Sequence, residues 1–383
     1  MIIIVAPYSP IGLSECPHLG ASRKIEVVIR ALSELDKNIV LLNTAHNNCN
    51  SDEEVYDIDI SGVAVQTYTL RRYSSRKVGK LFNLKDVFSA VNKCIELGVP
   101  KLVWLYNGYA FENLFSLVIK RKVKVPVVLE FEDWHFSRSG GGNPKPYIDY
   151  LFWKLNLKNI DFAFGVNDNL VNILAKNGVK GAVLPGVVPV QLVESCERKD
   201  IFAKEVVRVG YFGGLSKEKG VDVVIDIINR LPGSYKVVVS GSGVLDKDLT
   251  ELSIKYPKQL EFHGLVSESK LYELIASVDV ILNPHSPISD MSQGVFPFKV
   301  IEAIASGRLL ITTELPPANV PGLLDGAVFY DGSSDELLQC ISGSRVAYKN
   351  LRKKITKSAM ISRNSFSLSA LLRPVKKIMN VSG

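Results

Sequence analysis

The sequence lacks the signatures of several classes of protein. Its five cysteines are odd in number and scattered without a close pair, at Cys16, Cys49, Cys94, Cys196 and Cys340. This spacing fits neither a disulfide framework nor a cysteine metal cluster. No apolar run approaches the roughly twenty residues that a membrane-spanning helix needs. The first ten residues, MIIIVAPYSP, lack the basic segment of a signal peptide, so we expect a cytoplasmic protein.

The chain does have an ordinary globular composition with a moderate excess of positive charge. It contains 383 residues, of which 46% are hydrophobic and 22% charged, and its formal net charge is +7. This length is enough for two domains of common size. The positive charge suits nucleic acid, an anionic membrane surface or a phosphorylated substrate, and does not by itself choose among them.

Short apolar runs alternate with segments of helical periodicity along most of the chain, which predicts an α/β fold. The stretch 187–205 shows no periodicity, and we interpret it as a linker between two domains. We therefore expect Rossmann-like domains at residues 1–188 and 205–360. A C-terminal helix at about 365–383 is expected to pack back on the first domain.

The first half places polar loops after its strands, where open α/β sheets gather functional groups. The loop after the first strand has Gly12 and Gly20 as flexible points and lacks the compact G-x-G-x-x-G motif of a dinucleotide site. The strand predicted at 125–131 ends in three catalytic candidates, Glu132, Asp133 and His135. The plain alternative is a loop-capping carboxylate and a surface histidine.

A basic segment, RRYSSRKVGKLF, follows the strand predicted at 63–70. Its cations are interleaved with apolar side chains and comprise Arg71, Arg72, Arg76, Lys77 and Lys80. This pattern is typical of a surface that rests on anionic lipid. The alternative is a solvated loop.

The second half contains two candidate anion sites. The first is the turn GGLSKEKG after the strand at 206–213, where Gly213 and Gly214 let backbone approach a ligand and Lys217 and Lys219 add positive charge. Its alternative is a turn with two solvated lysines.

The second site lies where the Ser- and Gly-rich loop HSPISDMSQGVF opens at a helix N-terminus, which favours phosphate. Lys299 and Glu302 share the polar face of that helix, as a cation for phosphate and a carboxylate for ribose hydroxyls. The alternative is an ordinary crossover with an exposed ion pair.

Four segments resemble, in order and spacing, the nucleotide-binding domain of retaining GT-B glycosyltransferases of the large group often numbered family four. They are YFGGLSKEKGVDVVID, VVVSGSG, EFHGLVSESKLYELIASVDVILNP and FPFKVIEAIASG. The similarity runs through the second half, and the first half agrees in architecture. The resemblance implies two Rossmann-like domains facing each other across a cleft, with the donor nucleotide on the second and the acceptor on the first.

The resemblance also implies roles for single residues. Lys219 matches the lysine that neutralises the donor diphosphate, and Glu302 matches the glutamate that holds the ribose. The backbone of Leu265 and Val266 would contact the base, next to Gly264. The sugar and phosphates would be lined by Gln293, Gly294, Val295 and Phe296.

Three positions depart from the family pattern. Gly214 and Gly294 stand where an arginine and a glutamate are frequent, and Glu132–Asp133 stands where the first domain often has His-Asp. Lys217 or Lys299 would have to replace the missing arginine charge. Glu132 would be able to act as a nucleophile or electrostatic stabiliser.

The resemblance implies retaining transfer of a hexose or related sugar to a glycan or a polyprenyl-diphosphate-linked acceptor, in surface polysaccharide synthesis. Cations and N–H groups would meet the charge on the leaving group, so we expect no metal and no cofactor. A sugar-nucleotide epimerase of the same fold and a non-catalytic partner subunit stay open as alternatives. We expect peripheral binding to the inner face of the membrane, and no nucleic-acid partner, because the basic residues and aromatics share no repeated element.

Overall fold

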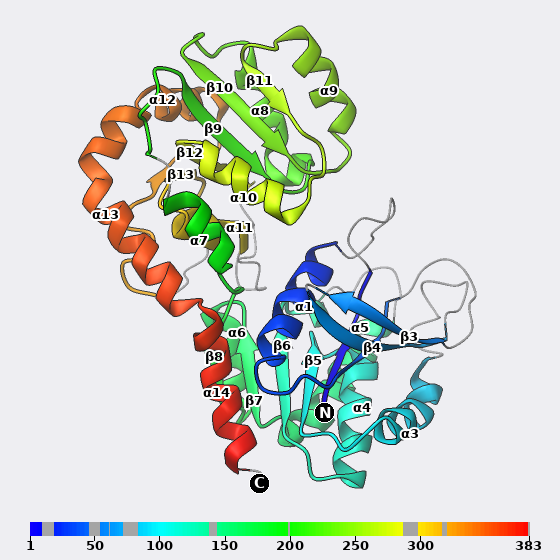
Figure 1. Ribbon diagram of the computed structural model, residues 1–383. Coiled ribbons are helices and arrows are strands. Elements are labelled where there is room, and N and C mark those ends of the chain that lie inside the picture. The colour runs from blue at the N-terminus through cyan, green and yellow to red at the C-terminus, as the bar shows by residue number, and fades with distance from the viewer. Residues whose placement is uncertain are drawn as a thin grey trace. The chain divides into compact units, whose positions relative to one another are not determined.

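The computed structural model describes residues 1–9, 19–45, 54–60, 62–71, 83–137, 144–197, 200–285, 298–315 and 320–381. The chain divides into two compact units (Figure 1). Unit 1 comprises the described residues of Met1–Leu184 and Leu368–Gly383, and unit 2 those of Pro185–Met291 and Phe296–Ser367.

Unit 1 is built on an eight-stranded sheet of order β3-β4-β2-β1-β5-β6-β7-β8. Its strands are β1 Ile2–Ala6, β2 Ile39–Asn43, β3 Glu54–Ile60, β4 Val63–Thr69, β5 Leu102–Tyr106, β6 Val127–Phe131, β7 Phe162–Gly165 and β8 Gly181–Val183. Neighbouring strands are parallel except in the β3–β4 hairpin. The sheet's centre is buried on both faces, which is why β1 reads as an unbroken apolar run and β2 as one that ends in Asn43, while β6 is apolar except for the buried Glu130.

Helices of unit 1 cover this sheet. They are α1 Leu19–Leu32, α3 Val87–Glu96, α4 Ala110–Lys122, α5 Lys145–Asn156, α6 Asp168–Lys176 and α14 Leu368–Val381, with short 3-10 turns η1 Asn83–Asp86, η2 His135–Ser137 and η3 Leu157–Asn159. One core lies under α3, α4 and α5, where Val91, Phe115 and Trp153 pack on the sheet. Two further helices of unit 1 also contact the sheet: α1 contacts β1, and α14 contacts β7.

Unit 2 is built on a six-stranded parallel sheet of order β11-β10-β9-β12-β13-β14 (Figure 1). Its strands are β9 Val207–Phe212, β10 Tyr235–Ser240, β11 Leu260–Phe262, β12 Val280–Asn283, β13 Leu309–Thr312 and β14 Val328–Phe329. Its helices are α7 Val190–Glu197, α8 Val221–Ile228, α9 Asp246–Lys255, α10 Glu268–Ser277, α11 Phe298–Ala305, α12 Ser334–Ser342 and α13 Ser344–Ser365, with the 3-10 turn η4 Lys217–Lys219.

The α/β prediction with two Rossmann-like sheets is confirmed, and some local predictions are wrong. The stretch 187–205 is not an aperiodic linker, because it contains α7, which packs on α10 and buries Leu192 and Cys196. The run LEFHGLV predicts a strand at 260–266, but β11 stops at Phe262, because Gly264 turns the chain with a φ of +60°. None of the helices in the described ranges is long and apolar enough to cross a bilayer.

Candidate functional site

Three loops meet at the carboxyl edge of the unit 2 sheet because glycine lets their backbones touch. A Cβ at Gly241, after β10, would lie 1.8 Å from the carbonyl oxygen of Gly213, after β9. A Cβ at Gly220 would lie 1.7 Å from the carbonyl oxygen of Pro284, after β12. Both glycines also have positive φ angles, +155° and +71°, which other residues rarely adopt. The turn after β9 is therefore held against the ends of both neighbouring strands.

Lys219 connects the glycine turn to the end of β12. It ends η4, and its Nζ lies 3.0 Å from Nε2 of His285 and 3.6 Å from a carboxylate oxygen of Glu218. His285 is buried, and its carbonyl oxygen accepts a hydrogen bond of 2.6 Å from the Thr313 hydroxyl. The Lys219 cation thus has the buried imidazole of His285 as its nearer neighbour and the carboxylate of Glu218 as its more distant one.

Lys299 brings a second cation to the same corner. It is the second residue of α11, and its Nζ is buried without a hydrogen-bond partner in the part of the chain that the structure describes. That Nζ lies 4.7 Å from the centroid of the Tyr211 ring, and a Cβ at Gly213 would lie 3.8 Å from it. Burial and, to a smaller extent, the nearby charge of Lys219 together lower the pKa of Lys299 to about 7. An anion placed here would relieve both effects.

The remaining predicted donor residues lie around this corner to different degrees. Gly214 and Lys217 are exposed, and the carbonyl oxygen of Gly214 accepts a hydrogen bond of 2.7 Å from the Tyr211 hydroxyl. Glu302 lies one turn after Lys299 in α11 and is partly buried. The other predicted donor residues of that loop, Gln293, Gly294, Val295 and Phe296, lie outside the described residues.

The turn proposed to contact the base follows β11, next to the glycine turns. The carbonyl oxygen of Gly264 accepts hydrogen bonds from the Gly241 amide, at 2.9 Å, and from the Ser240 hydroxyl, at 2.8 Å. Leu265 is exposed and Val266 partly buried.

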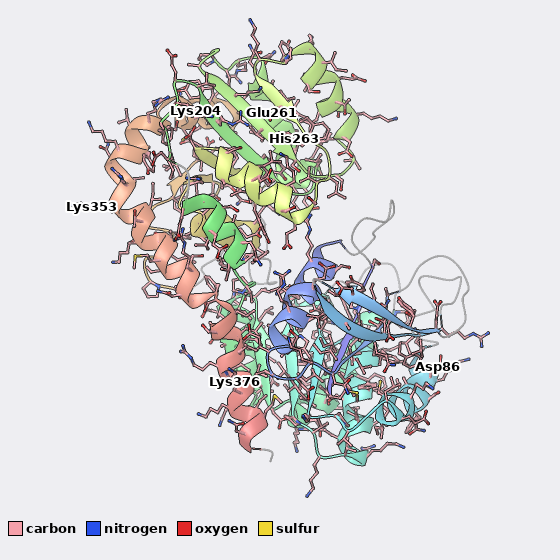
Figure 2. The ribbon with its side chains drawn as sticks, viewed as in Figure 1. Asp86, Lys204, Glu261, His263, Lys353 and Lys376 are labelled. Carbon is pink, nitrogen blue, oxygen red and sulfur yellow. The ribbon has the colours of Figure 1, made fainter. Side chains whose placement is uncertain are left out.

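A charged cluster fixes the strand that leads into this turn. Glu261 and His263 lie close together at β11, with 2.9 Å between Nε2 and Oε1 (Figure 2). Glu261 also accepts a hydrogen bond of 3.0 Å from Arg208. Burial acts to raise the pKa of Glu261, but the charge of Arg208, the hydrogen bonds from His263 and Arg208, and the charge of Lys236 together hold that pKa below its ordinary value. Since the His263 ring is occupied by Glu261, the backbone after it is what the turn can offer to a ligand.

In unit 1, Asn107 fixes the loop that carries the predicted catalytic residues. Its side-chain oxygen accepts hydrogen bonds from the amides of Glu132, at 3.0 Å, and Asp133, at 3.2 Å. Asn107 itself has a φ of +61°, and its amide donates to the carbonyl oxygen of Glu130. The ends of β5 and β6 are therefore joined by this one side chain.

Glu132 belongs to a buried charge cluster that the sequence did not reveal. Lys24 of α1 contacts the carboxylates of both Glu132 and Glu130, the latter at 3.1 Å, and the indole N–H of Trp104 donates to Glu130 at 2.8 Å. Burial raises the pKa of Glu132, and the charge of Lys24 opposes this rise. Burial alone would lower the pKa of Lys24, but the two carboxylates outweigh it and raise that pKa. The cluster holds one cation between two carboxylates.

His135 is not the surface residue of the plain alternative. It is buried in η2, its Nδ1 lies 3.3 Å from Oδ1 of Asp133, and its ring centroid lies 4.3 Å from that of Tyr109. Gly20 is not a loop residue, since it lies in the first turn of α1. Gly12 lies outside the described residues, as does the basic segment beyond the exposed Arg71.

The structure therefore brings the predicted residues together in two groups, one in each unit. Unit 2 joins Gly213, Gly214, Lys219 and Lys299, and unit 1 joins Glu132, Asp133 and His135. Sequence reasoning missed the neighbours that position them, which are Lys24, Trp104, Asn107, Glu130, Tyr211 and His285. In the described ranges no group of three His, Cys, Asp or Glu residues is arranged to hold a metal ion.

Comparison with known proteins by sequence finds a family match whose described residues lie within unit 2. Residues 206–343 match the family model described as Glycosyl transferases group 1. A curated relative, the glycogen synthase of Hydrogenovibrio crunogenus (strain DSM 25203 / XCL-2), is 26% identical in an alignment of 175 residues that covers 42% of this chain and 35% of the relative. The chain thus spans about a third of the length of that curated relative.

Solved structures match the chain over nearly its whole length. Sucrose-phosphate synthase from Thermosynechococcus elongatus has a TM-score of 0.66 at 12% identity, covering 100% of this chain and 99% of that one. The Anabaena protein HepE in complex with UDP-glucose has a TM-score of 0.66 at 13% identity, covering 99% of both chains. The α,α-trehalose-phosphate synthase (UDP-forming) of Burkholderia vietnamiensis has a TM-score of 0.66 at 11% identity, covering 100% of this chain and 99% of that one.

The likeness to these structures confirms the GT-B fold, and together with the group 1 match it confirms the resemblance to GT-B glycosyltransferases. At such low identity the solved structures establish the fold alone. By sequence, unit 2 matches the glycosyl transferases of group 1, and that match includes the glycine turn and both of its lysines.

Proposed function

We propose that the chain is a retaining glycosyltransferase that moves a hexose or related sugar from a nucleoside-diphosphate sugar to a hydroxyl group. The acceptor is a glycan or a polyprenyl-diphosphate-linked saccharide, in surface polysaccharide synthesis. The observation that carries the proposal is the pair Lys219 and Lys299 beside the glycine turn of unit 2. The group 1 match over this corner and the UDP and UDP-glucose complexes of HepE support a nucleotide sugar as donor.

The chemistry follows from charge. Breaking the bond between the anomeric carbon and the diphosphate leaves negative charge on the diphosphate, and prearranged cations stabilise that charge as it develops. The acceptor hydroxyl attacks the face that the diphosphate leaves, and its proton passes to the departing phosphate oxygen. The configuration is then retained. Because Lys219 and Lys299 supply the positive charge, the proposed reaction needs neither metal nor cofactor.

Lys299 supplies the positive charge of the arginine that the family often has at the position of Gly214. Its buried Nζ has no hydrogen-bond partner among the described residues, and it lies beside Gly213, whereas the stem of Lys219 lies beside Gly214. We assign Glu302 to the ribose hydroxyls and the backbone of Leu265 and Val266 to the base. Lys217, which is exposed, is assigned a minor part.

Unit 1 is proposed to bind the acceptor. Glu132, Asp133 and His135 are held at the carboxyl ends of β5 and β6, where α/β sheets bind ligands. The raised pKa of Glu132 suits a carboxylate that exchanges a proton or meets positive charge near neutral pH. We further propose a cytoplasmic enzyme whose basic segment 71–82 rests on anionic membrane.

A non-catalytic partner subunit is the second candidate, and Gly214 is the observation that favours it. Such a protein would bind the donor and fail to turn it over. Donor hydrolysis without any acceptor other than water would instead favour an epimerase of the same fold.

Isothermal titration calorimetry with UDP, GDP, ADP and dTDP, followed by their sugar conjugates, tests the proposal. We expect one nucleotide to bind clearly better than the others, and the matching sugar donor to be turned over with a glycan acceptor. Lys219→Ala should strongly lower turnover, whereas Lys217→Ala, at its exposed neighbour on η4, is the matched control. Binding without turnover across lipid-linked and free acceptors would instead support the partner subunit.

A further inference from the structure

Helix α5 exposes large apolar side chains along one face. Tyr147, Leu151 and Leu155 are spaced four residues apart, so they form a single row, and they are 70%, 55% and 57% exposed. Tyr150, at 40%, stands beside the row. Soluble monomers seldom gather so many exposed apolar side chains, and such patches mark a surface that binds something.

The exposed charges of α5 and η3 themselves have one sign. Between residues 144 and 159 the only acidic residue is Asp149, which is buried, paired with Lys145 and hydrogen-bonded to the amide of Ala110 at 2.9 Å. The exposed charges are Lys154 in α5 and Lys158 in η3. The row is therefore framed by cations and faces no carboxylate of its own helix.

The side chain of Lys154 lies along aromatic surface, the arrangement that is typical of a lysine at the boundary between apolar and aqueous surroundings. Its Nζ is 5.6 Å from the ring centroid of Tyr150 and 5.3 Å from that of Trp153, and it donates a hydrogen bond of 2.7 Å to the side chain of Asn177. The stem thus covers aromatic surface while the charged end reaches the rim. Asn177 ends α6, so this rim is shared by two helices.

The row is supported by a packed aromatic layer. Beneath α5, the Trp153 ring lies 5.5 Å from Trp134, 5.3 Å from Phe136 and 5.8 Å from Tyr150, measured between centroids. This packing holds the helix in place, so docking would order little additional chain.

We propose that the exposed face of α5, formed by Tyr147, Tyr150, Leu151 and Leu155 with Lys154 and Lys158, docks on the surface of an anionic lipid bilayer. The combination of tyrosine, leucine and lysine is that of interfacial helices, in which rings and leucines enter the headgroup layer and lysines meet phosphates. A protein partner fits less well because interface cores are depleted in lysine. A second copy of the chain would set the lysines against like charges. The inference assigns a membrane contact to α5, separate from the one proposed for the basic segment 71–82, and it stands without the proposed transfer reaction.

Liposome flotation of the full chain tests the proposal, with vesicles of phosphatidylcholine alone and of phosphatidylcholine mixed with phosphatidylglycerol. We expect wild type to float with the anionic vesicles at low salt, to be released by high salt, and to stay unbound to neutral vesicles. The variant Tyr147→Ser/Leu151→Ser/Leu155→Ser should lower the partition coefficient at least tenfold. The exposed apolar residues of unit 1 outside α5 supply the matched control, Phe88→Ser/Val99→Ser, which should float like wild type.

A second variant, Lys154→Ser/Lys158→Ser, changes only the rim and keeps the test decisive if the triple variant unfolds. It should lower binding to anionic vesicles severalfold and reduce the salt dependence. UDP titration on every variant separates this result from donor binding, which should not change. Wild type that fails to float at low salt, or both α5 variants floating like wild type, would overturn the proposal. If only a variant with serines in the basic segment 71–82 lost binding to anionic vesicles, the membrane contact would belong to that segment and the proposal for α5 would be wrong.

Discussion

The two units bury lysine in opposite ways. In unit 1, Lys24 lies between the carboxylates of Glu130 and Glu132, and its pKa is raised. In unit 2, the Nζ of Lys299 meets an aromatic ring and the field of Lys219, and its pKa is lowered to about 7. Buried charges are ordinarily paired, because an unpaired one carries a large desolvation cost. The difference indicates that unit 1 completes its own cluster, while unit 2 keeps a site for an anion that the chain does not supply.

The largest expected effect is on the stability of unit 1. Lys24→Met should lower the free energy of unfolding by about 3–5 kcal/mol, since it leaves two buried carboxylates without their cation. Chemical denaturation monitored by tryptophan fluorescence measures this change. Lys101→Met serves as the control with a smaller effect, because the Lys101 side chain is 62% exposed and its partner Asp36 keeps an ion pair with the N-terminal ammonium. An unchanged midpoint for Lys24→Met would mean that the cluster does not stabilise unit 1.

The next effect is on turnover in unit 2. Lys219→Ala should lower kcat by about two to three powers of ten, the scale for removing one charge partner of a transition state. Lys217→Ala should change kcat much less. Steady-state kinetics on both variants makes the comparison, and equal losses would mean that Lys217 has taken over from the missing arginine.

Glu302 should matter for affinity rather than for stability. Glu302→Ala is expected to weaken nucleotide binding by about 1–3 kcal/mol, the cost of leaving ribose hydroxyls without a charged acceptor. Calorimetry with the preferred nucleoside diphosphate measures it, and the free base or phosphate alone should bind the variant and wild type alike. Unchanged affinity would remove the ribose assignment.

The smallest expected effect is a gain in stability, opposite in sign to the loss expected for Lys24→Met. Lys299→Met should raise the free energy of unfolding by about 1 kcal/mol, because it removes a buried charge without a partner among the described residues. The folded-state pKa lies below the unfolded one, so the folded state binds fewer protons and wild-type stability should rise as pH increases from about 7 toward 10.5. The variant should lose this rise. Denaturation at several pH values tests both points, and destabilisation by Lys299→Met would contradict the contrast between the units.

Much of the scaffold follows from local patterns. The sequence pattern predicts a buried strand at 39–43 and a helix at 246–255, and β2 and α9 have these bounds. Strand β3 escaped prediction, since its residues are mostly exposed and it forms only through its antiparallel partner β4. Helix α7 was missed because it buries only two side chains, Leu192 and Cys196.

The site was predictable only where its residues are neighbours in sequence. The glycine turn with Lys219 is one short motif, and Lys299 with Glu302 is one helical turn. Lys24 and Glu132, by contrast, are 108 residues apart and meet only because α1 lies over the end of β6. Glu130, a charged residue inside an apolar strand, was the one local sign of that cluster.

The central claim is that the corner of Lys219 and Lys299 in unit 2 is completed by a diphosphate. Calorimetric titration of the preferred nucleoside diphosphate near pH 8, in two buffers of different ionisation enthalpy, tests it most directly. A phosphate beside Lys299 would restore its proton, so wild type should take up close to one proton on binding, and affinity should fall by up to about tenfold per pH unit above 7. Lys299→Arg, which keeps the charge at every pH, should bind without proton uptake. Equal heats for wild type in both buffers, with affinity independent of pH, would contradict the account.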